Sequence, residues 1–167
     1  MPVETEEEGY PILTGPAWSF GIEVPAACIA PSDAAQHQSP GSLLMTPVDP
    51  SFPQRLNGGE ILTAGAFGKG TADAGPIQAI CEAGIAAVVA SSFDPTFSQL
   101  AREAGLPAVE IFEAMGIQTG EILRVDLEGG RVVNMSSGNR YPIRNLDEDL
   151  LAAYRHSVKT TPARNTK

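Results

Sequence analysis

The segment GEILTAGAFGKGTADAGPIQAICEAGIAAVVASSFDPTFSQLAREAGLPAVEI, residues 59–111, alternates apolar runs of strand length with amphipathic stretches that end on a glycine. Apolar residues three and four positions apart predict a helix, whereas short continuous apolar runs predict strands covered on both faces. Strands separated by helices at this spacing are typical of a parallel sheet with right-handed crossovers. The predicted strands are residues 60–64, 85–90 and 106–112. The first predicted helix begins around residue 73 and ends at 84, and the second spans residues 94–105.

The second predicted helix carries the clearest start and stop signals. Asp94 is suited to cap its first turn, and Pro95 is suited to its first helical position. Gly105 follows the last residue, where a left-handed backbone commonly ends a helix. Phe97 and Leu100 belong to the stripe that is expected to face the core.

Outside this segment the chain predicts shorter elements. The part before residue 74 is rich in Pro and Gly, with apolar bursts such as residues 17–22 and 27–30 that suggest short strands between long loops. Residues 121–134 alternate on both sides of a Glu-Gly-Gly turn, which predicts a β-hairpin. The fold class indicated by these elements is α/β.

The chain of 167 residues fits one globular domain, which we expect to span residues 10–158. Residues 1–9 are acidic and residues 159–167 are polar, so both ends are predicted to be disordered tails. The domain is predicted to end in a helix capped by Asn145 or Asp147, with acidic residues in its first turn and basic residues in its last.

Composition restricts the classes of partner. The net charge is −9 and the eleven Lys and Arg residues are scattered along the sequence, so we expect no basic face for nucleic acid or an anionic membrane. No apolar run approaches the roughly 20 residues that cross a bilayer, and the N-terminus lacks a signal-peptide pattern. We therefore expect a cytoplasmic protein.

The cysteines and histidines predict no metal site. Cys28 and Cys81 lack the spacing of a zinc site, and two thiols cannot by themselves hold a four-iron cluster. We expect both to be ordinary buried or half-buried thiols. His37 and His156 have no acidic partner nearby in the sequence and are expected at the surface.

The glycine-rich loop after the first predicted strand, residues 65–70, is the candidate site. A strand, a flexible turn and a helix start leave backbone amides unpaired, where a carboxylate or phosphate can bind, although many such loops bind nothing. A phosphate-binding P-loop is excluded because Lys69 precedes Gly70. A dinucleotide fingerprint that starts at Gly68 is excluded because Asp73 stands where its third glycine is needed.

The motifs of the chain, taken in order, resemble the small subunit of 3-isopropylmalate dehydratase, which is equivalent to the swivelling fourth domain of aconitase. The resemblance covers residues 18–134 and rests on five motifs. AFGKGTADAG at 66–75 matches the family's NFGxGSSREHA, VVASSFDPTF at 88–97 matches AxSFxxIF, and AGLPAVEI at 104–111 matches GLP. WSFGIEVPAACIAP at 18–31 matches FGDxxDTDxIIP, and TGEILRVDLEGGRVVN at 119–134 matches the terminal hairpin of the family.

This resemblance implies a three-layer β/β/α swivelling domain of the aconitase type, with a mixed sheet, crossover helices and a C-terminal β-hairpin. It also implies a large partner subunit that carries a [4Fe–4S] cluster, over which the domain closes like a lid. The family is a hydro-lyase family, which moves water across a small hydroxy acid through an alkene. The loop of the family supplies a Ser that acts as base or oxyanion-binding group, and an Arg that grips a substrate carboxylate.

The site residues follow from the resemblance position by position. The hydroxyl of the family's first Ser is retained at Thr71, which is the expected catalytic residue. The family's Arg falls on Asp73, and this reversal of charge makes a dicarboxylate bound there hard to defend. Lys69 is either a replacement cation or a solvated side chain. The expected substrate-binding residues are Gly68, Lys69, Gly70, Ala72 and Asp73.

The upstream motif also departs from the family. Its Asp-Thr-Asp falls on Pro25, Ala26 and Ala27, which removes an acid that supports the hydroxyl. Three functions stay open: a hydro-lyase subunit with a different substrate, a catalytically silent lid that binds or regulates a large subunit, and a stand-alone anion-binding α/β protein.

The Pro- and Ser-rich residues 30–55 are the other candidate for substrate contact. By analogy with a specificity loop of the family, Leu43, Leu44 and Met45 are expected either to reach the substrate or to anchor a surface loop.

Overall fold

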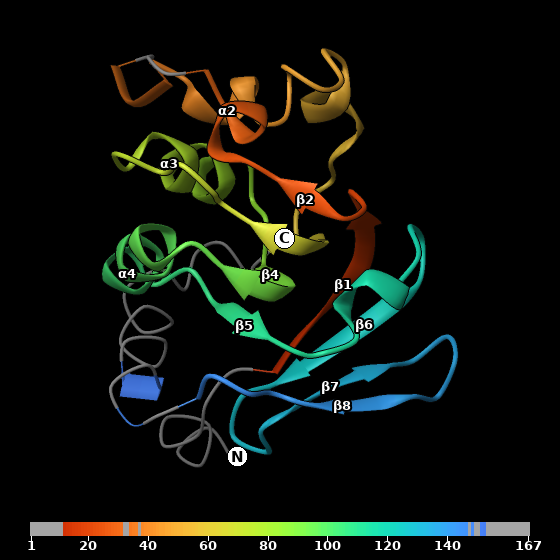
Figure 1. Cartoon of the computed structure of the whole chain (residues 1–167). Coiled ribbons are helices and arrows are strands. Elements are labelled where there is room, and N and C mark those ends of the chain that lie inside the picture. Colours follow the sequence, from red (N-terminus) through yellow and green to blue (C-terminus); the bar gives the residue numbers. More distant parts are fainter. Residues whose placement is uncertain (1–11, 32–33, 37, 147, 149–150, 153–167) are drawn as a thin grey trace, which may run out of the picture.

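The computed structural model describes residues 12–31, 34–36, 38–146, 148 and 151–152 (Figure 1). Within this part, eight strands form one mixed sheet in the order β5-β4-β3-β1-β6-β7-β8, and β2 also pairs with β3. The strands are β1 (Ile12–Ser19), β2 (Glu23–Val24), β3 (Ile61–Phe67), β4 (Ala87–Phe93), β5 (Ala108–Glu110), β6 (Ile122–Asp126), β7 (Arg131–Asn134) and β8 (Arg140–Pro142). The helices are α2 (Ala26–Ile29), α3 (Gly75–Glu82) and α4 (Pro95–Ala104), with 3-10 turns η1 (Ala34–Gln36), η2 (Pro40–Leu43), η3 (Phe52–Arg55) and η4 (Ala114–Gly116).

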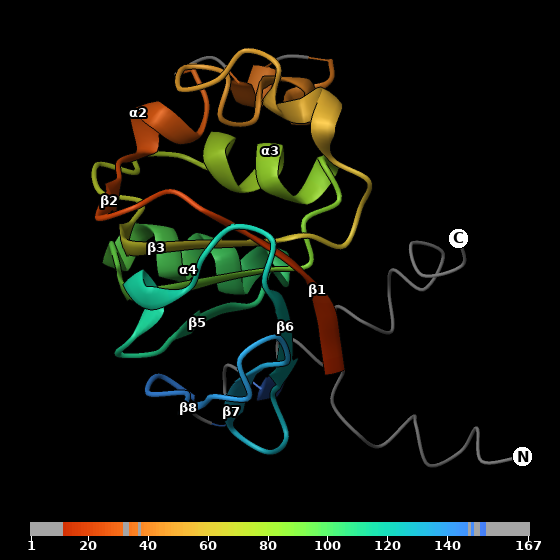
Figure 2. The same ribbon diagram turned by 90° about the vertical axis from the view of Figure 1, so that its right-hand side faces the viewer.

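Strand β1 joins two parts of the sheet. Its residues 17–19 pair in parallel with residues 61–63 of β3, whereas residues 12–16 pair antiparallel with β6. Strands β3, β4 and β5 continue the parallel part, and β6, β7 and β8 form an antiparallel ribbon below it (Figure 2). The parallel strands inferred from residues 59–111 are therefore confirmed.

Two hydrophobic cores lie on opposite faces of the parallel strands. Side chains alternate between them: Val88 and Ala90 of β4 face the core that contains α3 and α4, while Ala87 and Val89 face the core shared with the antiparallel ribbon. This alternation explains why β4 is apolar at successive positions, since a strand covered on both faces has no polar side. The predicted three-layer β/β/α architecture is confirmed.

The local signals place α4 correctly. The Asp94 carboxylate accepts hydrogen bonds from the amides of Thr96 and Phe97, and Gly105 ends the helix with a φ of 77°. The predicted hairpin also forms, as β6 and β7. In contrast, β3 runs on to residue 67, three residues beyond the predicted end, because it gains β2 as a second neighbour there.

One expectation for the first half of the chain is wrong, and another is narrowed. Residues 27–30 were expected in a strand, but α2 occupies residues 26–29. Leu44 and Met45 are fully buried, which agrees with the alternative that they anchor the loop and not with the alternative that they reach a substrate. The segment around them forms short 3-10 turns that pack on α3, where the Gly41 amide donates to the Glu82 carboxylate.

Several expectations fall wholly or partly outside the described residues. These are the two tails, most of the last helix, and the surface positions of His37 and His156. Asn145, one of the two candidate caps, is described: its side chain accepts from the Glu110 amide at 2.9 Å and donates to the Ala108 carbonyl at 3.1 Å, and so covers the free edge of β5. Cys28 and Cys81 are half-buried thiols, as expected. Among the residues that the structure describes, none of the helices has the length and apolar character needed to span a bilayer.

The ribbon contains a carboxylate that makes stability depend on pH. The backbone amide of Gln118 and the side-chain amide of Asn134 donate to Glu121 and lower the pKa of its carboxyl below the ordinary 4.5. A lowered folded-state pKa stabilises the fold above the unfolded-state value, and this contribution is lost as pH falls through the folded-state value. We expect the free energy of unfolding to decrease below about pH 4.5. Urea unfolding between pH 7 and 3 should show a smaller decrease for Glu121→Gln; an identical decrease would contradict this.

Candidate functional site

The glycine loop, residues 68–74, leaves the carboxyl end of β3. Its first two residues are fixed by the end of β2 and the start of α2, because the Gly68 amide donates to the Val24 carbonyl and the Ala26 amide donates to the Lys69 carbonyl, both at 2.8 Å. The structure thus places Val24 and Ala26 of the upstream motif against the glycine loop, although more than forty positions separate them from it in the sequence. Ligands of parallel α/β sheets commonly bind at this end of the strands.

Asp94 holds the tip of the loop, a role that the sequence analysis missed. Its Oδ2 accepts the Gly70 amide at 3.2 Å, while its Oδ1 caps α4 and its own amide donates to the Phe67 carbonyl at 3.0 Å. One side chain therefore joins the loop to the next helix. The sequence did contain a signal for this contact. Asp94 directly follows β4, and β4 is the parallel neighbour of β3, so the two strands end at the same edge of the sheet.

Gly68 is required by the geometry of the loop. It has a φ of 93°, and a Cβ atom at this position would lie 2.7–2.9 Å from the side chain of Phe97. Gly70 also has a left-handed φ, of 86°, but a Cβ atom there would meet nothing within 4 Å. The loop is therefore packed at its start and open at its tip.

Thr71 lies inside the turn of the loop. Only 7% of it is exposed, and its Oγ1 donates to the Gly68 carbonyl at 2.5 Å, with its amide donating to the same oxygen at 3.0 Å. The hydroxyl hydrogen is thereby engaged, while the lone pairs of Oγ1 stay available as acceptors. In this arrangement Thr71 can accept a hydrogen bond, and it can donate one outward only by leaving the Gly68 carbonyl.

Asp73 is exposed and lies two residues before the first residue of α3. Its Oδ1 accepts the Gly75 amide at 2.9 Å, so a negative charge stands at the positive end of the helix dipole. Because of this carboxylate, the helix start is poorly suited to a second anion. Lys69 is exposed and forms no ion pair with any described residue, which makes it the cation available on the loop.

The predicted site residues therefore divide into two groups. Gly68 and Thr71 are buried together and hydrogen-bonded to each other, whereas Lys69, Gly70, Ala72 and Asp73 form the exposed rim of the loop. The amides of Ala72 and Ala74 donate to no described residue, so part of the donor set inferred from the sequence is present. The Gly70 and Gly75 amides are already taken by carboxylates of the chain.

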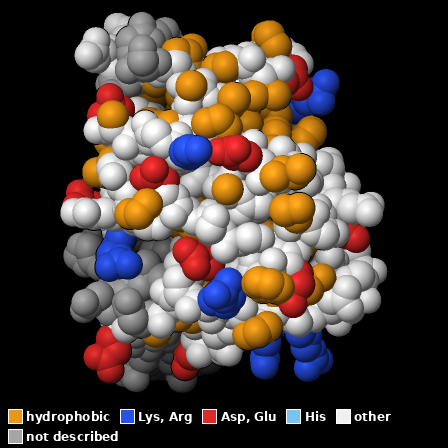
Figure 3. Space-filling model, viewed as in Figure 1, with side chains coloured by type: hydrophobic (Ala, Val, Ile, Leu, Met, Phe, Trp, Pro, Cys, Tyr) orange, Lys and Arg blue, Asp and Glu red, His pale blue; other side chains and the backbone are white. Residues whose placement is uncertain are grey.

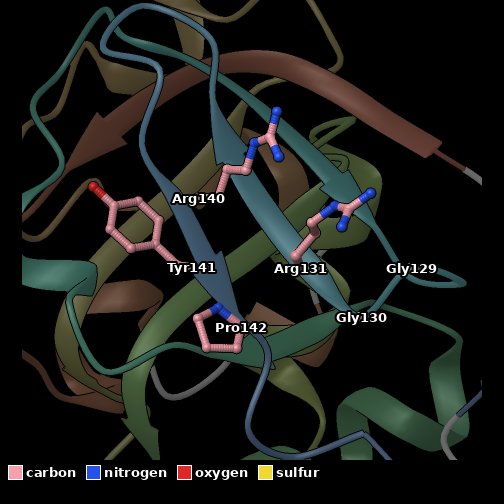
Figure 4. A pocket seen from close by; sticks show the side chains of 6 residues that line it. All are labelled: Gly129, Gly130, Arg131, Arg140, Tyr141 and Pro142. Carbon is pink, nitrogen blue, oxygen red and sulfur yellow. The ribbon is translucent and has the colours of Figure 1, made fainter.

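A second polar feature lies on the antiparallel ribbon, away from the loop (Figures 1 and 4). Arg131 and Arg140 flank a shallow hollow of about 270 Å³, with Tyr141 and the Gly129–Gly130 turn beside them. Arg124 lies on the same face, since strand register aligns it with Val133 and Arg140. Three arginines thus share one face of the ribbon with Asp126, whose register partner is Arg131. The hollow shares no residue with the glycine loop.

No set of three or more His, Cys, Asp or Glu side chains in the described residues is arranged to hold a metal ion. The two thiols, on α2 and α3, are too few for the cysteine ligation of a four-iron cluster. This chain's donors therefore do not fit such a cluster.

Comparison with known proteins finds relatives that share one description, the small subunit of 3-isopropylmalate dehydratase. The 3-isopropylmalate dehydratase small subunit of Nautilia profundicola is 33% identical over 149 residues, which cover 85% of this chain and 90% of the relative. The same subunit of Moorella thermoacetica is 37% identical over 137 residues, covering 79% and 82%.

The chain belongs to the 3-isopropylmalate dehydratase small-subunit family.

The solved structures agree. The 3-isopropylmalate dehydratase (LeuD) structure from Methanocaldococcus jannaschii superposes with a TM-score of 0.76 at 25% identity, covering 92% of this chain and 99% of that one. Aconitase X from Thermococcus kodakaraensis, at 15% identity and a TM-score of 0.53, shares the fold. No protein-family model matches the chain. The resemblance to the small-subunit family that the sequence shows is therefore confirmed, and so is the β/β/α architecture that it implied.

Proposed function

We propose that this chain is the small subunit of a hydro-lyase of the aconitase superfamily, and that it places the glycine loop over a site completed by a large subunit. The observation that carries the proposal is the loop itself. Residues 68–74 are pinned by the Val24–Ala26 segment and by Asp94, and they present one oriented hydroxyl, one free cation and unpaired amides at the carboxyl edge of the sheet.

Thr71 is the proposed catalytic residue. Its oxygen is oriented by the Gly68 carbonyl, and from there it accepts a hydrogen bond from the substrate or, after turning, donates one to a developing oxyanion. Lys69 is the proposed binding group for a substrate carboxylate. Asp73 is the proposed partner of a hydroxyl or cationic group, since a carboxylate beside it is repelled. The substrate class is a hydroxy acid that does not place a second carboxylate at Asp73.

A [4Fe–4S] cluster is proposed to reside in the large subunit, because the thiols of this chain do not fit one. When bound there, such a cluster supplies a Lewis acid for the departing hydroxyl. The contribution of this chain is to position the Thr71 hydroxyl and exclude water. A cytoplasmic location is inferred for the assembled enzyme.

The proposal is tested by anaerobic co-expression of the full chain with large subunits of the family, followed by hydration assays on a panel of unsaturated acids. We expect a complex that hydrates at least one monocarboxylate or side-chain-modified acid. A complex that is inert on every acid would favour the catalytically silent lid, and the absence of any complex would favour the stand-alone anion-binding protein.

A further inference from the structure

Three large hydrophobic side chains are exposed at the carboxyl edge of the sheet. Ile22 and Phe112 are each 73% exposed and Met115 is 54% exposed, and we call these three residues the carboxyl-edge patch. Burying such side chains is favourable because it removes apolar surface from water. Groups of exposed apolar side chains on a soluble protein commonly mark a surface that binds another protein.

The fold brings Ile22 and Met115 together at Gly65. A Cβ atom at Gly65 would lie 2.8 Å from Cγ and Sδ of Met115, and the Ile22 carbonyl would be within 2.4 Å of it. The Gly65 amide donates to the Gly21 carbonyl, and the Ala66 amide donates to that of Ile22. Glycine at this position of β3 therefore lets the turn before β2 and the η4 turn meet across the strand.

Phe112 is fixed from the other side of the patch. Its carbonyl accepts the Ser91 hydroxyl of β4 at 3.1 Å, and the Arg144 guanidinium lies 5.5 Å from the centre of its ring. Aromatic residues, Met and Arg are the types enriched in protein interfaces, where rigid anchors lose little entropy on binding. The patch is thus held by backbone and ring contacts before any partner arrives.

The backbone that carries the patch leads into the glycine loop. Gly65 lies in β3, three residues before Gly68, which follows the end of β3, and Ser91 lies in β4, three residues before Asp94, which follows the end of β4. Figure 3 views the face at this edge and shows hydrophobic side chains exposed among polar ones. A partner whose site meets the loop must bring its own surface within reach of this patch.

We infer that the carboxyl-edge patch is the surface on which the large subunit docks. This inference rests on the proposed function and adds to it which side chains carry the contact. Phe112 and Met115 bury against an apolar surface of the large subunit, with Ile22 at the margin, and the desolvated contact shields the adjoining loop from water. The glycine loop is polar and small, so it orients groups at the site but adds little to the affinity for the large subunit.

The test measures the dissociation constant between the purified full chain and the large subunit by calorimetry. We expect Phe112→Ser combined with Met115→Ser to weaken binding at least tenfold. The matched control is Val48→Ser combined with Met135→Ser, because Val48 and Met135 are both 53% exposed and lie away from this edge. This control should bind as the unmodified chain does. If the double variant fails to fold by circular dichroism, the single variants replace it.

The outcomes separate the two proposals. Unchanged binding by folded patch variants, with the unmodified chain binding normally, overturns the docking inference and leaves the proposed function intact. No binding of the unmodified chain to any large subunit overturns both. A homodimer of this chain that the patch variants dissociate, with no change in large-subunit binding, assigns the patch to a second copy and also overturns the inference.

Discussion

Thr71→Val is expected to lower kcat of the assembled enzyme by about 10²- to 10⁴-fold, the usual contribution of a positioned proton-transfer or oxyanion-binding group. Valine matches threonine in shape and fills the same buried space, so the change removes the hydroxyl with little repacking. Thr71→Ser should retain most of the activity, because it keeps an oxygen that can donate to the Gly68 carbonyl.

The measurement is steady-state hydration kinetics on the reconstituted complex, with the affinity for the large subunit measured in parallel. A purely structural hydroxyl would lower stability by about 1 kcal/mol through the lost hydrogen bond and leave kcat nearly unchanged. Activity of Thr71→Val within a few-fold of the unmodified chain would therefore contradict a catalytic role. A loss of kcat with unaltered binding affinity would support one.

Gly68→Ala is expected to reduce the free energy of unfolding by about 2–5 kcal/mol. Two costs add: the left-handed backbone disfavours a side chain by about 1–2 kcal/mol, and overpacking against Phe97 costs about 1–3 kcal/mol. The geometry behind the second cost is the 2.7–2.9 Å separation between a new Cβ atom and the Phe97 side chain. Chemical denaturation of the isolated chain measures the loss.

Gly70→Ala is the control, because it tests only the cost of placing a side chain on a left-handed backbone. Its φ of 86° is close to that of Gly68, but its Cβ position is empty, so only about 1–2 kcal/mol should be lost. Equal losses for the two variants would show that Phe97 moves aside at no cost. The contrast should also appear in catalysis, because a displaced Gly68 carbonyl no longer orients the Thr71 hydroxyl.

Much of the fold could be predicted because its signals are local. The cap at Asp94, the stop at Gly105 and the hairpin at residues 121–134 all depend on backbone preferences of a few neighbouring residues, and each was placed correctly. Helix α2 was missed because residues 26–29 form a single turn, too short for a periodic pattern.

The candidate site was predictable in part. Sequence order put the glycine loop after a strand and identified Thr71 as its hydroxyl-bearing residue. It did not reveal that Asp94 binds the Gly70 amide or that the Asp73 carboxylate occupies the start of α3. Analogy with the specificity loop of the family left open whether Leu44 and Met45 reach the substrate or anchor the loop, and only the tertiary structure shows that both are buried.

The sequence by itself determined the alternation of strands and helices, the two-sided burial of β4 and the family, because each follows from short-range order along the chain. Only the tertiary structure decided which distant groups meet. Register between strands aligned Arg124 with Val133 and Arg140, and the close approach at Gly65 brought Ile22 and Met115 together. Such contacts join residues far apart in the chain, and their partners are fixed only when the sheet is assembled.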